Sequence, residues 1–326
     1  MLAILGAGKI GTAFASLLAK RSRRIVLYSI EEEVVHELNT KHTNDRYLPG
    51  IRLPAHVSAC TDIGSAVSDA DFVFIAVPTH AVASVLSNAA RFLKRDALIV
   101  SITKGIDQET LEPLILHQAR ILPASLRSRT VLLGGPAIAS EFVTSPITGL
   151  IAASRTLEYA ETVRRAFEHA SLRISTSTDV IGVGLSSSLK NVYSIALGIC
   201  DGLEFSANAK ALIFTCAIQE MCELVAAAGG NKMTVLHLAG VGDLYVSGHS
   251  MHSQNRAYGE RLARQSKLDP HSPPQTIEGI VTLESALKLA KQHRIRTPLL
   301  AAVAACMHAR TPSAKPFHSY LSRLKC

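Results

Sequence analysis

One lysine, Lys190, lies within a long run of small and apolar residues between Gly184 and Gly198 and has no acidic neighbour in the sequence. The run is long enough for several helical turns, so we expect it to enter a folded core. A buried ammonium group is unfavourable unless it is paired, and its pKa then falls. Lys190 is therefore a candidate proton donor or acceptor. The alternative is a lysine at the edge of a core helix whose charge reaches solvent.

A glycine motif near the start indicates a second kind of chemistry. An apolar strand is expected at residues 1–6 and a helix at residues 12–20, with Gly6, Gly8 and Gly11 at the spacing G-x-G-x-x-G between them. The first glycine permits a tight turn, the second admits a pyrophosphate, and the third lets helix and strand pack closely. Backbone amides at the helix start face the phosphates. The motif predicts a dinucleotide-binding domain, with NAD(H) or NADP(H) as the cofactor.

The end of the second strand bears on the choice between these cofactors. A carboxylate at this point accepts a hydrogen bond from the ribose 2′-hydroxyl of NAD. Here the strand at residues 25–28 is followed by Ser29, and Glu31 comes slightly later. No arginine stands at that point to bind a 2′-phosphate. The preference between NAD and NADP is therefore left open.

Further apolar runs extend the predicted sheet. Residues 72–77 stop at Pro78, and residues 97–101 lead into Lys104. Strand ends of this kind border the ligand crevice of an open α/β sheet, so Pro78 and Lys104 are candidate binding residues. The remaining strands are expected at residues 131–133, 149–153 and 172–175.

The pattern changes after Asp179, where strand-like runs give way to long segments rich in Ala and Leu. A chain of 326 residues is also too long for one small core. We predict an α/β Rossmann domain with a doubly wound, mostly parallel sheet at residues 1–178. An all-helical substrate-binding and catalytic domain is predicted at residues 179–326, with the active site between the two. Residues 269–274 are expected to form a loop because they are rich in proline.

The composition is typical of a compact globular protein, with 48% hydrophobic and 18% charged residues. No apolar run is expected to span a membrane, because Lys104, Asp179 or Lys190 interrupts each one. The first residues lack the features of a secretory leader. The six cysteines show no C-x-x-C spacing and are expected to be reduced, mostly buried thiols of a cytoplasmic protein.

The formal net charge of +8 raises the question of nucleic-acid binding, but the basic residues are scattered and the chain has no Trp. The densest basic cluster, at residues 20–24, has no interleaved aromatic side chains. A positive excess suits a small anionic ligand equally well. The predicted partner is therefore a small anionic substrate and not a nucleic acid. The apolar segment at residues 298–307 packs either on the chain itself or on a second copy in a homodimer.

Several other motifs follow one another in a recognisable order: residues 101–106, Lys190 with Asn191, residues 238–244, then Ser247 and residues 253–255. Taken with the glycine turn, they resemble the NAD(P)-dependent glycerol-3-phosphate dehydrogenases as far as about residue 300. Shorter pieces of the chain also resemble family motifs: residues 47–50, 135–139 and 277–279. The resemblance implies reversible reduction of dihydroxyacetone phosphate to sn-glycerol 3-phosphate by NAD(P)H, for glycerophospholipid synthesis.

The resemblance also implies roles for individual residues. Lys190 would protonate the carbonyl oxygen as hydride arrives, and Lys104 would orient the substrate and stabilise developing negative charge. Asp243 would pair with Lys190 or hold the substrate hydroxyl, and Asn191 would position the same group. Other substrate contacts would be Gly135, Ser247, Ser253, Gln254 and Asn255. Cofactor contacts would be Gly6, Gly8, Lys9, Ile10, Gly11, Ser29, Pro78, Lys104, Ala139 and Glu278.

The sequence departs from the family pattern on the substrate side. Gln254 stands where the family has an arginine that reaches the substrate phosphate, and losing such a charged contact costs about 2–3 kcal/mol of binding. Arg256 is expected to point elsewhere on its helix, and Cys216 stands at another arginine position of the family. Two alternatives follow: a dehydrogenase that has moved to another ketone or phosphorylated ketose, and a dinucleotide-binding regulator without turnover.

The remaining polar groups are given structural roles. His249 and His252 are interpreted as helix or loop residues, because no clear third ligand for a metal accompanies them. Cys216 and Cys222 are interpreted as buried core thiols. Asp201 is expected to cap or turn the chain after the apolar helix.

Overall fold

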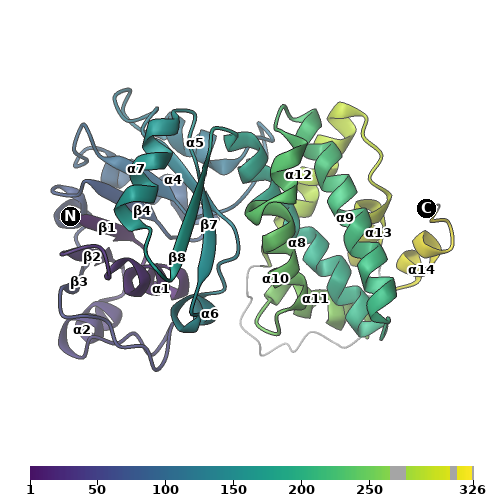
Figure 1. Ribbon diagram of the computed structural model, residues 1–326, viewed down its shortest axis with the longest axis horizontal. Helices are drawn as coiled ribbons and strands as arrows, with labels where there is room; N and C mark the ends of the chain where they lie inside the picture. The colour runs from purple at the N-terminus through teal and green to yellow at the C-terminus, as the bar shows by residue number, and fades with distance from the viewer. Residues whose placement is uncertain (265–276, 309–313, 325–326) are drawn as a thin grey trace. The chain divides into compact units, whose positions relative to one another are not determined.

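The chain forms two compact units in the computed structural model (Figure 1). The segment at residues 105–113 belongs to the same unit as residues 181–326, which is called the helical unit below. The predicted division at residue 178 places this segment in the first domain instead. Ile106 and Leu111 of this segment belong to the hydrophobic core of the helical unit. The structure describes residues 1–264, 277–308 and 314–324, so the loop predicted at 269–274 lies outside the described residues. The units are residues 1–104 with 114–180, and residues 105–113 with 181–326.

The first unit is built on one eight-stranded sheet. Its strands are β1 (Leu2–Leu5), β2 (Ile25–Tyr28), β3 (Val57–Cys60), β4 (Phe72–Ile75), β5 (Leu98–Ser101), β6 (Thr130–Gly134), β7 (Thr148–Ala153) and β8 (Leu172–Ser177). They lie in the order β3-β2-β1-β4-β5-β6-β7-β8, and every neighbouring pair is parallel except β6 with β7. The winding direction reverses between β1 and β4, which is where open α/β sheets bind ligands. The predicted Rossmann sheet is confirmed.

Helices cover both faces of this sheet. Along β1, Leu2 and Ile4 enter one hydrophobic cluster, and Ala3 and Leu5 enter the other. The first cluster is covered by α1 (Lys9–Leu18), α2 (Glu32–Thr40), α6 (Ala139–Thr144) and α7 (Leu157–Phe167). The second is covered by α3 (Ile63–Val67), α4 (Val82–Ala90), which follows the short η1 (Thr79–Ala81), and α5 (Leu114–Ile121). Burial on both faces explains why most of the strands read as continuous apolar runs.

Two local features differ from the sequence prediction. Strand β3 was not predicted, because it is a short edge strand of mostly small residues whose side chains alternate between buried and exposed. The helix expected at residues 12–20 begins instead at Lys9, directly after the N-cap residue Gly8. The glycine motif itself forms its first turn, where the Thr12 amide donates to the Gly8 carbonyl at 2.9 Å.

The second unit is helical and is organised around α8 (Val180–Gly202). Contrary to the prediction, Lys190 does not stop α8 from being long and apolar enough to cross a membrane by length and composition alone. However, 89% of its most apolar window is buried, as in the core helix of a globular unit. The other helices are α9 (Ala207–Ala227), η2 (Lys232–Leu236), η3 (Leu238–Gly242), α10 (Asp243–His249), α11 (Gln254–Ala263), α12 (Glu278–His293), α13 (Pro298–Met307) and α14 (Lys315–Leu321).

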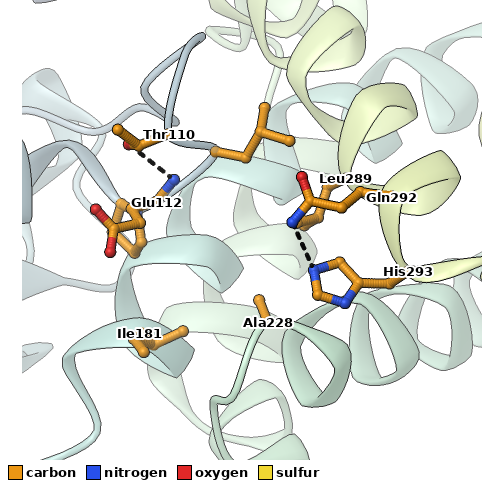
Figure 2. Close-up of a pocket in the computed structure, with 9 residues that line it drawn as sticks. Thr110, Glu112, Ile181, Ala228, Leu289, Gln292 and His293 are labelled. Atoms are coloured by element: carbon orange, nitrogen blue, oxygen red, sulfur yellow. Dashed lines mark hydrogen bonds between the residues drawn. The ribbon is translucent and has the colours of Figure 1, made fainter.

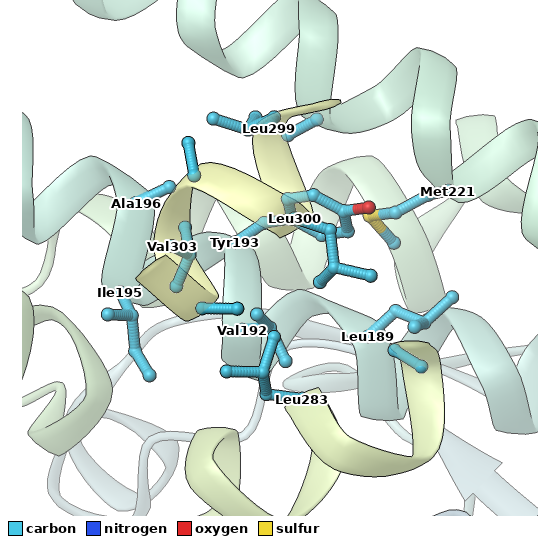
Figure 3. Packing of buried hydrophobic residues seen from close by; sticks show 14 of the residues in the cluster. Leu189, Val192, Tyr193, Ile195, Ala196, Met221, Leu283, Leu299, Leu300 and Val303 are labelled. Carbon is cyan, nitrogen blue, oxygen red and sulfur yellow. The ribbon is translucent and has the colours of Figure 1, made fainter. Parts of the chain in front are cut away.

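The core of the helical unit joins α8 to α9, α12 and α13 (Figure 3). Figure 3 shows Val192 and Tyr193 of α8 close to Leu300 of α13 and Leu283 of α12. Leu299, Leu300 and Val303 of α13 are fully buried in this cluster. The apolar segment at residues 298–307 therefore packs on the chain itself.

One carboxylate, that of Glu220 on α9, is buried within this core. It accepts hydrogen bonds from the Leu299 amide at 2.6 Å, the Leu300 amide at 3.0 Å and the Tyr193 hydroxyl at 3.0 Å. Two of these donors are amides of the first turn of α13, whose N-cap residue Thr297 makes no side-chain cap. Burial raises the pKa of Glu220 to about 7 in spite of the three donors. Glu220 thereby ties α8, α9 and α13 together.

The raised pKa of Glu220 predicts a pH-dependent stability. From the ordinary carboxyl pKa of 4.5 up to about 7, the folded state retains a proton that the unfolded state releases. The free energy of unfolding therefore falls as pH rises through this window, by roughly 3 kcal/mol in total. We expect Glu220→Gln to remove this part of the pH slope, measured by urea unfolding followed by circular dichroism. Glu223→Gln, at an exposed position on the same helix, is the control and should leave the slope unchanged. An unaltered slope in Glu220→Gln would contradict the assignment.

Candidate functional site

The glycine turn after β1 has the shape of a pyrophosphate cradle. Gly6 adopts a φ of +114°, which favours glycine, and a side chain at Gly11 would overlap the Gly6 carbonyl oxygen. A Cβ atom at Gly8 would instead meet nothing within 4 Å. The first turn of α1 contains no acidic residue, and its N-cap makes no side-chain hydrogen bond. The turn is therefore closed on its inner side and open over the helix N-terminus, where an anion is bound favourably.

A buried asparagine holds the glycine turn in place. The Asn44 side-chain amide donates to the Ala7 carbonyl and to the Thr12 hydroxyl, each at 2.8 Å. Asn44 is fully buried, although it lies in the irregular loop that follows α2. Sequence reasoning missed it, because an asparagine in a loop is typical of an ordinary turn.

The other cofactor-contacting candidates of the first unit lie at strand ends and helix starts. Lys9 and Ile10 begin α1, and Pro78 precedes η1 just after β4. Ser29 follows β2, and its hydroxyl accepts from the Glu31 amide at 3.2 Å. Ala139, the first residue of α6, is buried in a small apolar cluster beside α1.

Two candidate substrate residues meet in the first unit. The Lys104 ammonium group, just beyond β5, donates to the Gly135 carbonyl at 3.4 Å. The Lys104 carbonyl in turn accepts from the Thr79 hydroxyl at 3.0 Å. Gly135 has a φ of +112° and follows β6 directly. Lys104 is therefore held at a carboxyl end of the sheet, as predicted from its position after the strand.

In the helical unit, Lys190 is buried on α8 and paired. Its ammonium nitrogen donates to the Ser247 hydroxyl at 2.5 Å and lies 3.1 Å from Asp243 Oδ1. The Ser247 hydroxyl donates to the same Asp243 oxygen at 3.3 Å. Asp243 starts α10 immediately after the π-turn η3, a type of turn found often at functional sites. The interpretation of Lys190 as a lysine that reaches solvent at a helix edge is therefore wrong.

A second hydrogen-bonded chain links three other candidates in the same unit. The Asn191 side-chain amide donates to Glu278 Oε2 at 2.9 Å. Its carbonyl oxygen accepts from the Asn255 side chain at 3.0 Å, and the Asn255 oxygen accepts from the Gly279 amide at 3.0 Å. This chain joins α8 to the first turns of α11 and α12 and fixes the orientation of Asn191.

The close crossing of α8 and α11 depends on a glycine. A Cβ atom at Gly259 would overlap the Ile195 carbonyl oxygen, so no other residue permits the same approach. At the start of α11, the Ser253 hydroxyl accepts from the Arg256 amide at 3.3 Å and caps the helix. Gln254 follows as the first residue of α11 and is exposed.

Arg256 does not stand in for the arginine that Gln254 replaces. Its buried guanidinium pairs with Asp201 at 2.5 Å and with Glu260 at 3.2 Å. Its Nε atom donates to the Ser250 carbonyl at 3.1 Å, which fixes the turn before α11. Asp201 was predicted to cap or turn the chain after the apolar helix. It lies within α8, and its side chain caps nothing but pairs with Arg256 and Lys210. Its carbonyl does take part in the following turn, where it accepts from the Glu204 amide at 3.0 Å.

The cysteines and histidines show one further correction. Cys216 and Cys222 are half-buried and not fully buried as predicted. Cys200 is buried in the core, and burial raises the pKa of its thiol to about 12. The His249 ring nitrogen Nδ1 lies 2.8 Å from the Tyr245 carbonyl. Among the residues that the structure describes, no three His, Cys, Asp or Glu side chains cluster as a metal site would require.

One pocket of the helical unit contains none of the candidate residues (Figure 2). Its volume is about 210 Å³, below the roughly 300–1,000 Å³ of most small-molecule sites. Gln292 and His293 make a hydrogen bond of 3.3 Å at its edge. We therefore do not take this pocket as the functional site, for which the glycine turn and the Lys190 cluster are the candidates. It is lined by Thr110, Leu111, Glu112, Pro113, Ile181, Ala228, Leu289, Gln292 and His293.

Comparison with known proteins identifies the family of the chain. Residues 1–160 match the family model of the NAD-dependent glycerol-3-phosphate dehydrogenase N-terminus, and residues 179–317 match that of the C-terminus. The chain belongs to the NAD-dependent glycerol-3-phosphate dehydrogenase family. The resemblance, the fold and the enzyme class expected from the sequence are confirmed, as is the expectation of an NAD(P) cofactor with no preference assigned.

Relatives of this dehydrogenase chain match over most of their length. The glycerol-3-phosphate dehydrogenase [NAD(P)+] of Enterococcus faecalis is 38% identical over 91% of this chain and 88% of its own. That of Bacillus licheniformis is 36% identical over 93% of this chain and 88% of its own. The crystal structure of glycerol-3-phosphate dehydrogenase from Coxiella burnetii superimposes with a TM-score of 0.88 and 29% identity, covering 99% of this chain and 98% of that one.

The buried ion pairs of Arg256 predict a structural and not a substrate-binding role. We expect Arg256→Ala to lower the free energy of unfolding by about 3–5 kcal/mol, because Asp201 and Glu260 would lose a buried partner. Arg264→Ala is the matched control: Arg264 is exposed and also pairs with Glu260, at 3.0 Å, and such a surface pair contributes about 0–1 kcal/mol. Equal losses in the two variants, measured by denaturant unfolding, would show that the Arg256 pairs add no special stability.

Proposed function

We propose that the chain catalyses the reversible NAD(P)H-dependent reduction of dihydroxyacetone phosphate to sn-glycerol 3-phosphate. Membership in the family supports this reaction, and so does the open glycine turn of the first unit. The observation that carries the proposal is the buried Lys190 ammonium group, 3.1 Å from Asp243 and bonded to Ser247. Ketone reduction needs a proton donor in a site that excludes water, and this cluster provides one.

In the proposed reaction, the glycine turn would hold NAD(P)H, which would supply the hydride for the carbonyl carbon of the substrate. Lys190 donates a proton from its ammonium nitrogen to the carbonyl oxygen as negative charge develops there. Asp243 pairs with the Lys190 ammonium group before the proton is transferred and fixes the direction of its nitrogen. Ser247 accepts from Lys190 and donates to Asp243, so its hydroxyl orients both partners.

The remaining candidates are assigned to orientation of the substrate. Asn191 is held at both ends of its amide, so its position changes little when a ligand binds. Ser253 caps α11, and Gln254 and Asn255 begin it, so that these three residues lie at a helix N-terminus, which favours the phosphate group of the substrate. In the first unit, Lys104 adds a positive charge at a strand end. The product serves glycerophospholipid synthesis in the cytoplasm.

Replacement of Lys190 by Ala tests the proton-donor role. We expect turnover of dihydroxyacetone phosphate, followed by NADH and NADPH oxidation, to fall at least about a hundredfold, because general acid catalysis supplies that much. Dinucleotide binding, measured by calorimetry, should stay near the wild-type value, because the glycine turn lies in the other unit.

Lys288→Ala provides the control for the loss of one lysine charge, since Lys288 lies exposed on α12. Its turnover should match that of the wild type. Retained turnover in Lys190→Ala would refute the proton-donor role.

A second candidate function rests on Gln254, which is exposed and neutral at the start of α11. In this alternative the enzyme reduces another ketone or phosphorylated ketose and needs no charged contact at that point. If dihydroxyacetone phosphate is the substrate, Gln254→Arg should lower its KM by about tenfold or more, because a charged phosphate contact contributes roughly 1.5–3 kcal/mol. Steady-state kinetics with both proteins measure this. A wild-type enzyme that dihydroxyacetone phosphate does not saturate, together with an unchanged kcat/KM in Gln254→Arg, would favour the alternative.

A further inference from the structure

Three side chains meet in the first unit where β2 ends and α2 begins. The Tyr47 hydroxyl donates to Glu31 Oε1 at 2.6 Å, and Arg46 Nη1 lies 2.7 Å from Glu31 Oε2. The Arg46 guanidinium also lies over the Tyr47 ring, 5.5 Å from its centroid. The hydrogen bond to Glu31 raises the pKa of Tyr47, so its hydroxyl remains a donor. Both carboxylate oxygens of Glu31 are therefore held by one loop.

The loop that carries Arg46 and Tyr47 is anchored beside the pyrophosphate cradle. Asn44 binds the Ala7 carbonyl inside the glycine turn at 2.8 Å. On the other side, the Glu37 carboxylate of α2 accepts from the Thr43 hydroxyl and from the Asp45 backbone amide, each at 2.8 Å. Because the loop is fixed at both places, the position of Glu31 relative to the glycine turn is also fixed.

This position is where a Rossmann domain receives the adenosine ribose, since the carboxyl end of β2 lies beside the glycine turn. NAD offers a neutral 2′-hydroxyl there, and an ionised carboxylate such as Glu31 can accept a hydrogen bond from it. NADP offers a phosphate of roughly −1.5 to −2 charge instead. That phosphate would meet the carboxylate of Glu31, with the guanidinium of Arg46 already paired to it.

We propose that Glu31, held by Tyr47 and Arg46, makes this enzyme bind NAD(H) in preference to NADP(H). A 2′-phosphate would need the Arg46 guanidinium as its partner, but the ion pair with Glu31 already occupies that group. The Arg46 side chain is 59% exposed, so loss of the pair would leave it able to turn towards a phosphate. The proposal rests on the dinucleotide-dependent function above and adds the residues that select the cofactor.

The test compares the dissociation constants of NADH and NADPH for the full chain without substrate. The chain has no Trp, so calorimetry and the fluorescence of the nicotinamide itself are the suitable readouts. We expect the wild type to bind NADH at least about tenfold more tightly than NADPH. Glu31→Gln keeps a hydrogen-bond acceptor for Tyr47 and removes the charge. It should tighten NADPH binding about tenfold, through the released Arg46.

The double variant Glu31→Gln/Arg46→Ala should lose this gain in NADPH affinity, which distinguishes release of Arg46 from simple removal of a repulsive charge. Glu32→Gln is the matched control, because it removes an exposed carboxylate next in sequence that is outside the Tyr47–Arg46 contacts. Equal or tighter binding of NADPH by the wild type overturns the proposal, as does equal NADPH affinity of the single and double variants. An active enzyme with either result would leave the proposed reaction standing.

Discussion

The helical unit depends on one electrostatic constraint, the burial of a lysine charge in the middle of an apolar helix. α8 runs through the core with its most apolar window almost entirely buried, and Lys190 lies at its centre. Such a charge is tolerated only if a partner is placed beside it with good geometry. Asp243 and Ser247 meet this requirement, and the π-turn before α10 brings them to the lysine. The elements that hold α10 and α8 together therefore also position the lysine that we propose as the proton donor.

The interactions of the residues that follow Lys190 on α8 also restrict its orientation. Asn191, the residue after Lys190, is held between Glu278 and Asn255, so α8 cannot rotate without breaking hydrogen bonds to α11 and α12. One turn further along, Tyr193 binds the buried carboxylate of Glu220, which also caps α13. The rigidity of the core is in this way transferred to the orientation of the lysine.

The sequence was sufficient for most of the fold because the signals were local and repeated. The glycine turn lay between an apolar strand and a helix, and the change after Asp179 separated the sheet from the helices. Strand β3 was not predicted, because its residues are mostly small and it pairs with a neighbouring strand on one edge only. Asp201 was misread because its partners, Arg256 and Lys210, are distant in sequence or on another helix. The contacts of Asn44 and Arg46 were missed for the same reason: they depend on how the loop folds back on the glycine turn.

The crossing at Gly259 has a consequence for how this enzyme can change. α11 is fixed against α8 by a contact that admits no side chain and by the buried pairs of Arg256. Its first residue, Gln254, is exposed and outside both of these contacts. Substitutions there can alter what the tip of the helix recognises while the frame that carries the lysine stays intact. In the roles that we propose for Gln254 and Lys190, substrate range and catalytic machinery are therefore separable in evolution, and a library confined to the tip of α11 would sample new specificities on an unchanged scaffold.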